Sequence, residues 1–252
     1  MLMDQYTYLF LDVGNILFHD IAVEMVFNYW VYCKLNSKLQ FSFFKVRNYE
    51  LKNRNLSWLY EYCRKNNPEC AEDILRVAWE IVIENWIDIN IPIKSAIEAV
   101  YQISKYIPIS IAANQPVETE TLLKKYGITD MVEYVLLDSN MGVSKPKKEF
   151  FDQILSITSQ SAADVLFLGD RIDNDIIPAY RNGMTSIWIQ YKPIFVKSTL
   201  VPNWWAQKFC ENYSKVAPFN LWKFNKEFDK NITPYKFRNL HSFMDAYISK
   251  KI

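Results

Sequence analysis

The sequence predicts an α/β fold with a doubly wound parallel sheet, and three observations support this prediction. Short apolar runs with little polar alternation recur along the chain, as expected for strands buried on both faces. Segments with helical periodicity lie between these runs, and such alternation is typical of a parallel α/β core. Polar side chains follow several of the runs, at the edge where open parallel sheets bind their ligands.

Five apolar runs are expected to form strands. The first, YTYLFL, ends directly before a carboxylate, and the other four are similarly short. Helices are expected between them. In the expected helix Ile93–Tyr106, for example, Ile97, Val100 and Ile103 recur on one face. The expected strands are Tyr6–Leu11, Ile107–Ala113, Tyr134–Leu137, Val165–Leu168 and Ser186–Ile189. The expected helices are Ile93–Tyr106, Glu118–Tyr126 and Glu149–Ser156.

Residues 21–89 differ from this alternating pattern. They are rich in Tyr, Trp and Phe and carry helical periods, with no clear buried strand. We interpret them as a helical module inserted after the first strand, so that residues 1–20 and 90–252 form the core. The helical segments expected within the module are Ala22–Leu35, Leu56–Lys65 and Ala71–Trp86.

A second unusual stretch, residues 193–231, combines aromatic residues with lysines and precedes a closing helix expected at Arg238–Ser249. We assign it to the core as an insertion. Its aromatics would form an apolar patch if they stayed in water, so they must pack on the core, on the helical module or on a partner chain. We expect the core, with a homo-oligomer contact through the module or residues 193–231 as the alternative.

Composition and charge exclude several classes of protein. The 252 residues are 50% hydrophobic and 23% charged, which is typical of a globular chain. With 29 basic and 28 acidic residues the net charge is +1, so we expect neither nucleic acid nor a membrane surface as a partner. No uncharged apolar stretch approaches the roughly 20 residues that span a bilayer.

The start of the chain and its cysteines indicate the compartment. The first residues lack the basic region and the small-residue cleavage site of a signal peptide. The four cysteines fit no zinc-binding spacing, and we expect them to be free thiols in a reducing compartment. The protein is therefore expected to be cytoplasmic. The cysteines are Cys33, Cys63, Cys70 and Cys210.

Three of the apolar runs are expected to place polar groups at one edge of the sheet. Asp12 and Asn114 follow a run directly, and Asp170 follows one after a single glycine. Because the carboxyl ends of parallel strands meet at the same edge, these side chains should converge. This convergence predicts a functional site.

Four segments, in the order in which they occur, resemble the motifs of haloacid dehalogenase-like (HAD) hydrolases. The resemblance covers residues 5–20 and 92–192, and four motifs in order are far more specific than any one of them. It implies a Rossmann-like core, with the helical module at the position of the family's C1 cap. The segments are LFLDVGNILF, SIAANQP, GVSKPKKEFF and FLGDRIDNDIIPAYRNGM.

The resemblance implies a Mg²⁺-dependent phosphatase that acts on a small phosphorylated metabolite. Asp12 would be the nucleophile, forming an aspartyl-phosphate that water then hydrolyses. Mg²⁺ prefers oxygen ligands and would offset the negative charge of both nucleophile and phosphate. By resemblance, its ligands would be Asp12, the backbone carbonyl of Gly14, Asp170 and Asp175.

The resemblance also implies how the phosphate is bound. Lys145 would lie beside Asp12, keep it ionised and contact the phosphate. Asn114 and Gln115 lie at a strand-to-helix turn, where backbone N–H groups favour an anion. His19 follows the first motif and either touches substrate or has a structural role, and we favour the structural role.

Two positions depart from the usual phosphatase pattern. Gly14 replaces the second aspartate that serves as general acid and base, and Ala113 replaces a Ser or Thr that binds phosphate. Loss of a general acid–base group typically slows a reaction roughly 10²–10⁴-fold. A substrate with a good leaving group, such as a sugar 1-phosphate, would need less protonation.

These departures leave two alternatives to a phosphatase. One is a catalytically impaired binding or regulatory protein with the same fold. The other is a carbon–halogen or carbon–phosphorus hydrolase of the same superfamily, whose members also lack the second aspartate. Dehalogenases are metal-free, so Asp170 and Asp175 argue against that chemistry. The helical module contains no motif that indicates the substrate.

Overall fold

The fold is seen in a computed structural model, which describes residues 5–36, 62–65, 68–192, 194–211, 213 and 235–249. The chain divides into two units, which we call the sheet unit and the helical unit. The sheet unit comprises Met1–His19, Asn90–Lys192 and Phe224–Ile252, and the helical unit comprises Asp20–Ile89 and Pro193–Lys223.

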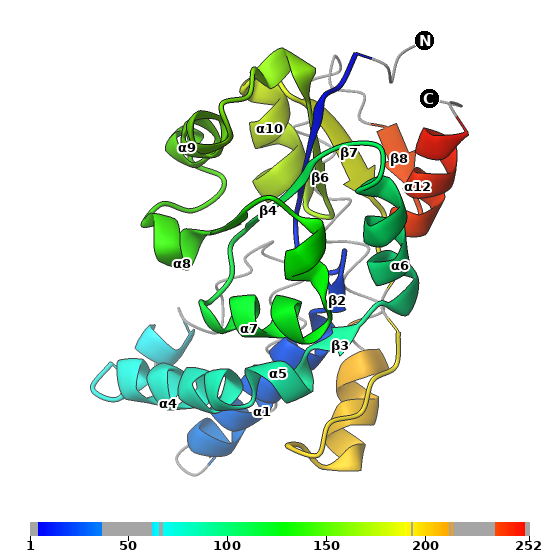
Figure 1. The fold of residues 1–252 in the computed structure, drawn as a ribbon. Coiled ribbons are helices and arrows are strands. Elements are labelled where there is room, and N and C mark those ends of the chain that lie inside the picture. The colour runs from blue at the N-terminus through cyan, green and yellow to red at the C-terminus, as the bar shows by residue number, and fades with distance from the viewer. Residues whose placement is uncertain are drawn as a thin grey trace. The chain divides into compact units, whose positions relative to one another are not determined.

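The sheet unit is built on a six-stranded parallel sheet with the strand order β5-β4-β1-β6-β7-β8 (Figure 1). The five predicted strands are all confirmed, with ends that shift by at most two residues. The sixth, β8, was not predicted. The strands are β1 (Tyr8–Leu11), β4 (Ile109–Ala113), β5 (Val135–Leu137), β6 (Val165–Gly169), β7 (Thr185–Ile189) and β8 (Tyr235–Phe237).

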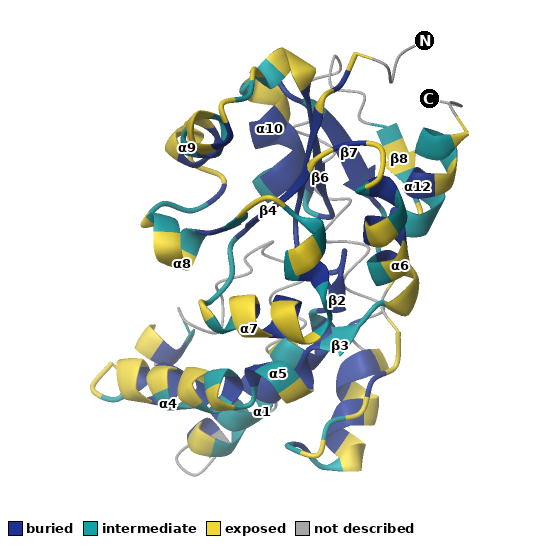
Figure 2. Ribbon diagram, in the orientation of Figure 1, coloured by how far each residue is buried: buried dark blue, intermediate teal, exposed yellow. Residues whose placement is uncertain are grey.

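The central strands are buried on both faces, as their apolar sequences predict. Every residue of β1, β4 and β6 is buried, as the dark blue of these central strands shows in Figure 2. On one face Tyr8, Phe10 and Phe167 pack with Phe150 and Phe151 in an apolar cluster. Burial of a phenylalanine side chain contributes roughly 1.5–3 kcal/mol.

Helices cover both faces of this sheet. In Figure 1, α9 and α10 lie on one side of it, and α6 packs with α12 on the other. The predicted helices are confirmed as α6, α7, α9 and α12, and α12 begins with a capping box between Asn239 and Ser242. The helices are α6 (Lys94–Ile103), α7 (Glu118–Lys125), α8 (Asp138–Met141), α9 (Lys148–Thr158), α10 (Ile177–Arg181) and α12 (Leu240–Ile248).

A short antiparallel pair lies where the chain leaves and re-enters the sheet unit. It is formed by β2 (Phe18–His19) and β3 (Ile91–Pro92). The buried ring of His19 makes a 2.7 Å hydrogen bond between its Nδ1 and the hydroxyl of Tyr191, and burial lowers the pKa of His19. His19 thus has a partner within the sheet unit, as a structural role would require.

The helical unit contains α1 (Ile21–Asn36), which packs against α4 (Ala71–Glu84), and the short α5 (Trp86–Ile89). Two of the module's predicted helices, α1 and α4, are confirmed. Residues 62–65 are also helical, whereas the rest of the predicted helix Leu56–Lys65 lies outside the described residues. Apolar residues occur all around α1, so α4 alone cannot bury it.

The other side of α1 is covered by the helix at residues 203–211. The Trp205 indole N–H donates to the carbonyl of Met25 at 3.2 Å, and the Trp205 ring lies 5.3 Å from the Tyr29 ring and 5.0 Å from the Tyr32 ring. Further along, the Tyr213 hydroxyl donates to Glu24 at 3.3 Å. Aromatic packing of this kind accounts for the unusual composition of the stretch.

This packing corrects one prediction. The aromatic stretch at 193–231 was assigned to the core, but its described residues, 194–211 and 213, belong to the helical unit. The apolar surface of α1 is the physical reason, because α4 packs on one part of it and Trp205 packs on another. The remaining aromatics of the stretch, from Phe219 to Phe228, lie outside the described residues.

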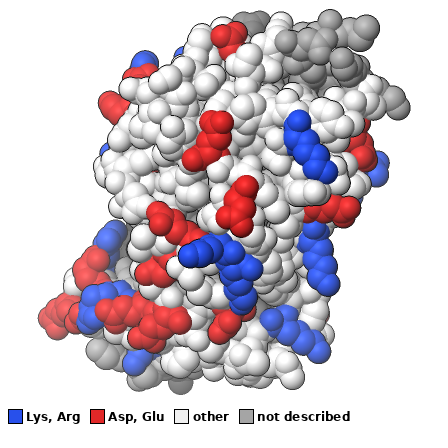
Figure 3. Space-filling view, in the orientation of Figure 1, with Lys and Arg blue, Asp and Glu red and all other residues white. Residues whose placement is uncertain are grey.

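The surface charges, the helices and the cysteines also bear on whether the protein has other functions. On the face seen in Figure 3, acidic and basic side chains are interspersed and do not gather into one patch. None of the described helices is both long and apolar enough to cross a membrane. All four cysteines, each of them among the described residues, are free thiols, and Cys63 and Cys210 are buried.

We predict that Trp205→Ala destabilises the helical unit by roughly 3–5 kcal/mol, because it leaves a cavity beside α1 and removes the hydrogen bond to the Met25 carbonyl. Trp204→Ala is the matched control, since Trp204 is 54% exposed and Trp205 only 1%. Urea unfolding followed by circular dichroism measures both. Equal losses in the two variants would contradict the packing described above.

Candidate active site

Two neighbouring strands place carboxylates at the same edge of the sheet. β1 ends at Leu11, directly before Asp12, and β6 ends at Gly169, directly before Asp170. The two strands pair in parallel with Leu11 opposite Leu168, and the Asp12 N–H donates to the Leu168 carbonyl at 2.9 Å. Sequence position and register together therefore bring Asp12 and Asp170 side by side.

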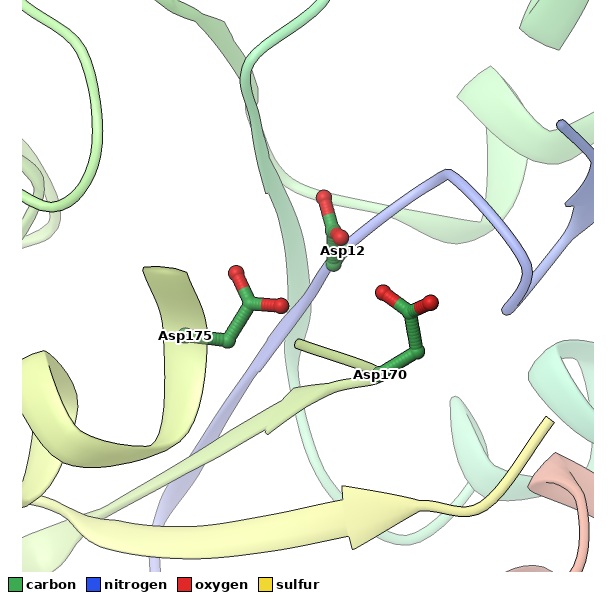
Figure 4. Close-up of side chains that lie close together, drawn as sticks. All are labelled: Asp12, Asp170 and Asp175. Carbon is green, nitrogen blue, oxygen red and sulfur yellow. The ribbon is translucent and has the colours of Figure 1, made fainter. Parts of the chain in front are cut away.

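A third carboxylate reaches this edge from the loop after β6. The loop forms a π-helical turn, η3 (Ile172–Ile176), which brings Asp175 back beside the strand end. The Arg171 N–H donates to Asp175 Oδ2 at 3.0 Å and fixes the side chain. Figure 4 shows the carboxylates of Asp12, Asp170 and Asp175 gathered from these three places. One oxygen of each lies within 4.8 Å of the others, and all three residues are buried.

The close approach of Asp175 requires a glycine at position 169. A β-carbon placed on Gly169 would lie 2.5 Å from the β-carbon, the carboxyl carbon and Oδ2 of Asp175. Such contacts are far closer than side-chain atoms tolerate, so any larger residue would displace Asp175. This steric requirement explains why glycine precedes Asp170 at the end of β6.

Lys145 lies at the centre of the cluster and pairs with two of its members. Its ammonium Nζ is 2.9 Å from Asp12 Oδ1 and 2.6 Å from Asp175 Oδ1, and its side chain is almost wholly buried. Burial alone would lower the pKa of Lys145. The Asp12 and Asp175 carboxylates outweigh that effect and raise the pKa of Lys145 above its ordinary value, so the ammonium stays charged.

Asn114, at the end of β4, holds Lys145 in place through its backbone. The Asn114 side-chain amide donates to the Lys145 carbonyl, and the Lys145 N–H donates to Asn114 Oδ1, both at 2.9 Å. The neighbouring Gln115 N–H donates to Asp138 Oδ1 at 2.8 Å. The sequence predicted phosphate binding for Asn114 and Gln115, whereas here the Asn114 side chain and the Gln115 N–H have partners within the protein.

Among the described residues, the acids of this cluster outnumber the basic side chains that pair with them. Three buried carboxylates face one ammonium, and the remaining acid of the loop, Asp173, is paired with Arg171 at 2.7 Å. Burial raises the pKa of Asp175 to about 6; Lys145 opposes this rise and Asp12 adds to it. Excess negative charge held out of water is unfavourable without a cation.

The donor set fits a hard divalent cation such as Mg²⁺. It consists of carboxylate oxygens close to one another, which such an ion prefers to nitrogen or sulfur. Gly14, the fourth predicted ligand, is buried two residues after Asp12 and forms an isolated bridge with Phe18. Asp12, Lys145, Asp170 and Asp175 are thus brought together at the edge that the sequence predicted.

Two residues of the site were missed by the sequence analysis. The Asn15 side chain donates from Nδ2 to Asp170 Oδ2 at 3.0 Å, and the Trp188 indole donates to the Asp170 carbonyl at 2.9 Å. Asn15 had a detectable signal, since asparagine after glycine at a strand end favours a turn that can aim its side chain back. Trp188 had none, because its strand was identified by apolar character alone.

We predict that Gly169→Ala lowers the free energy of unfolding by roughly 1–3 kcal/mol, because the added methyl group overpacks against Asp175. The sign of the change in the free energy of unfolding shows whether the added methyl group has space. With free space, alanine within a strand would be more stable than glycine by roughly 0.5–1 kcal/mol. Chemical denaturation of the unaltered protein and of Gly169→Ala measures this change. A stabilised variant would contradict the close approach of Asp175.

Comparisons with known proteins agree with this geometry. A family model described as HAD-hydrolase-like matches residues 142–191. Over 81 residues the chain is 31% identical to a glyceraldehyde 3-phosphate phosphatase from Pyrococcus abyssi, covering 32% of this chain and 34% of that protein. Over 90 residues it is 24% identical to a pyrimidine 5′-nucleotidase from Escherichia coli, covering 35% and 40%. The chain thus spans about a third of the length of the curated relatives it matches.

The fold is also similar to solved structures over nearly its whole length. A HAD-superfamily hydrolase of subfamily IA from Geobacter sulfurreducens matches with a TM-score of 0.63 at 13% identity, covering 96% of this chain and 97% of that one. Identity this low shows the fold alone. Together, the fold, the family model over residues 142–191 and the sequence relatives support membership of the haloacid dehalogenase-like hydrolase superfamily.

Proposed function

We propose that the protein is a Mg²⁺-dependent phosphatase that hydrolyses a small phosphorylated metabolite through an aspartyl-phosphate on Asp12. The observation that carries the proposal is the buried cluster of Asp12, Asp170 and Asp175, with Lys145 bonded to the would-be nucleophile. The two relatives named above, a phosphatase and a nucleotidase, act on phosphate esters according to their names, which supports the same reaction class.

The proposed ligands of Mg²⁺ are Asp12, the backbone carbonyl of Gly14, Asp170 and, directly or through water, Asp175. Asp170 is expected to matter more than Asp175, because both oxygens of Asp175 already accept hydrogen bonds, from Lys145 and from the Arg171 N–H. When bound, Mg²⁺ would offset the negative charge that a carboxylate and a phosphate bring together.

The protein's own residues then have distinct parts in the reaction. Asp12 attacks phosphorus with a carboxylate oxygen, so that a new oxygen–phosphorus bond forms while the bond to the leaving alcohol breaks. Lys145 pairs with Asp12 and contacts the phosphate. Water afterwards attacks the phosphorus of the aspartyl-phosphate, releases inorganic phosphate and restores Asp12.

The phosphate is proposed to contact Lys145, Asn114 and Gln115. Asn114 would use its backbone N–H, because its side chain holds Lys145. The Gln115 N–H would first have to leave Asp138. Gly14 supplies no proton to the leaving oxygen, so we expect substrates whose leaving group needs little protonation.

A second candidate function, a catalytically impaired binding protein, is favoured by one further observation. Besides Gly14 and Ala113, two predicted phosphate-binding groups, the Asn114 side chain and the Gln115 N–H, are engaged within the protein. Carbon–halogen hydrolysis is disfavoured, since it has no need of three clustered carboxylates. The free cysteines agree with a reducing compartment, and we propose a cytoplasmic location.

A panel of phosphorylated metabolites tests the proposal directly. Assayed with Mg²⁺ for release of inorganic phosphate, at least one should be hydrolysed, with sugar 1-phosphates and similar good leaving groups favoured. Binding of phosphate esters without any turnover would instead support the binding protein.

We predict that Asp12→Asn lowers phosphatase activity roughly 10³-fold or more, because an amide cannot attack phosphorus. The fold should be retained, since the amide has the same size, and circular dichroism checks this. Asp152→Asn serves as control, because Asp152 is exposed and pairs with Lys148 on the surface. Retention of most of the activity in Asp12→Asn would remove Asp12 from the mechanism.

We predict that chelation with EDTA abolishes activity and that added Mg²⁺ restores it. Asp170→Asn should raise the Mg²⁺ concentration needed for half-maximal activity. Asp173→Asn, in the same loop but paired with Arg171 outside the cluster, should change it little. Full activity in excess chelator would contradict the metal site and would favour metal-free chemistry.

A further inference from the structure

Asp170 is held at two points by residues from outside its own loop. Asn15, which follows β1, donates its side-chain N–H to the carboxylate at 3.0 Å, and Trp188, in β7, donates its indole N–H to the backbone carbonyl at 2.9 Å. Both donors are buried, with Trp188 1% exposed. The carboxylate and the backbone of Asp170 are therefore fixed independently of each other.

The backbone of Asn15 indicates that its side chain has a particular use. Asn15 adopts a left-handed φ of 55°, and its N–H donates to the Phe18 carbonyl at 2.7 Å, closing the turn after β1. Glycine would adopt this conformation with the least strain, and asparagine tolerates it better than most residues. What asparagine adds to the turn is a carboxamide, and that carboxamide reaches Asp170.

The chemistry of that donor suits a cation site. A lysine or arginine at position 15 would orient Asp170 but would also neutralise it. A carboxamide N–H is uncharged, so it orients the carboxylate and leaves its negative charge for a metal ion. Residues that orient metal ligands by hydrogen bonds typically change metal affinity or activity roughly 10–100-fold when they are replaced.

We propose that Asn15 is a positioning residue for a divalent cation: its uncharged amide fixes the Asp170 carboxylate in the orientation that binds the ion. This role rests on the metal site of the proposed function. It explains the asparagine of the DVGN segment by metal binding and not by phosphate chemistry.

The test compares metal affinity in full-length variants, with Mn²⁺ as the probe, by electron paramagnetic resonance of the free ion. Asn15→Gly removes the amide and keeps the left-handed backbone, and we expect a dissociation constant roughly 10–100-fold higher. Ser159→Gly is the matched control. Ser159 has a φ of 56° at the end of α9 and is exposed, so Mn²⁺ binding should be unchanged.

A second variant and a stability measurement separate a loss of Mn²⁺ affinity from a loss of folding. If Asn15→Gly proves too unstable to titrate, Trp188→Phe is titrated in its place. It removes the indole N–H to the Asp170 carbonyl together with part of the buried ring, and we expect weaker Mn²⁺ binding. Urea unfolding without metal identifies that case. Unchanged or tighter Mn²⁺ binding in folded Asn15→Gly would overturn the role of Asn15 alone. Absence of Mn²⁺ binding to the unaltered protein would overturn the metal site itself, and the positioning role with it.

Discussion

The buried ion pairs of Lys145 are the interaction on which the site depends. One ammonium joins Asp12, from the end of β1, to Asp175, from the turn after β6, at 2.9 and 2.6 Å. Removing one partner of a buried ion pair typically costs roughly 3–5 kcal/mol, because the other charge is left uncompensated. Without Lys145, two adjacent carboxylates would repel each other in a region with little water to screen them.

Other contacts at the site follow from the need to hold this lysine and its acids in place. Asn114 bonds the Lys145 backbone from the end of β4, and glycine at position 169 makes room for Asp175. The parallel sheet brings these groups together, because β4, β1 and β6 are adjacent and end at the same edge. Even so, three buried carboxylates share one lysine among the described residues, and this gathering of acids is the physical basis for proposing a bound cation.

The sequence was sufficient for much of the fold and for the charged members of the site. Strands buried on both faces have distinctive apolar runs, and a carboxylate directly after such a run can lie only at the sheet's edge. β8 escaped prediction for a physical reason: it is a three-residue edge strand, only partly buried, with an exposed lysine in the middle. The packing of Trp205 on α1 could not be read from either segment, since it joins residues 180 positions apart.

The hydrogen bonds that orient the charged groups were likewise beyond sequence reasoning. Asn114 was expected to bind phosphate. Its carboxamide pairs with the Lys145 backbone, and no local pattern distinguishes that partner from a phosphate. Asn15 and Trp188 contact Asp170 from different strand ends, so their roles depend on the strand order β1-β6-β7. Residue type and spacing could predict which charges converge, whereas three-dimensional packing decides which neutral groups hold them.

Anomalous X-ray diffraction from crystals grown with Mn²⁺ would show whether the Asp12–Asp170–Asp175 cluster binds a divalent cation. We expect an anomalous peak at bonding distance from carboxylate oxygens of Asp12 and Asp170, with Lys145 still paired to Asp175. Saturating Mn²⁺ that gives no peak in the cluster, or a peak only elsewhere on the protein, would contradict it.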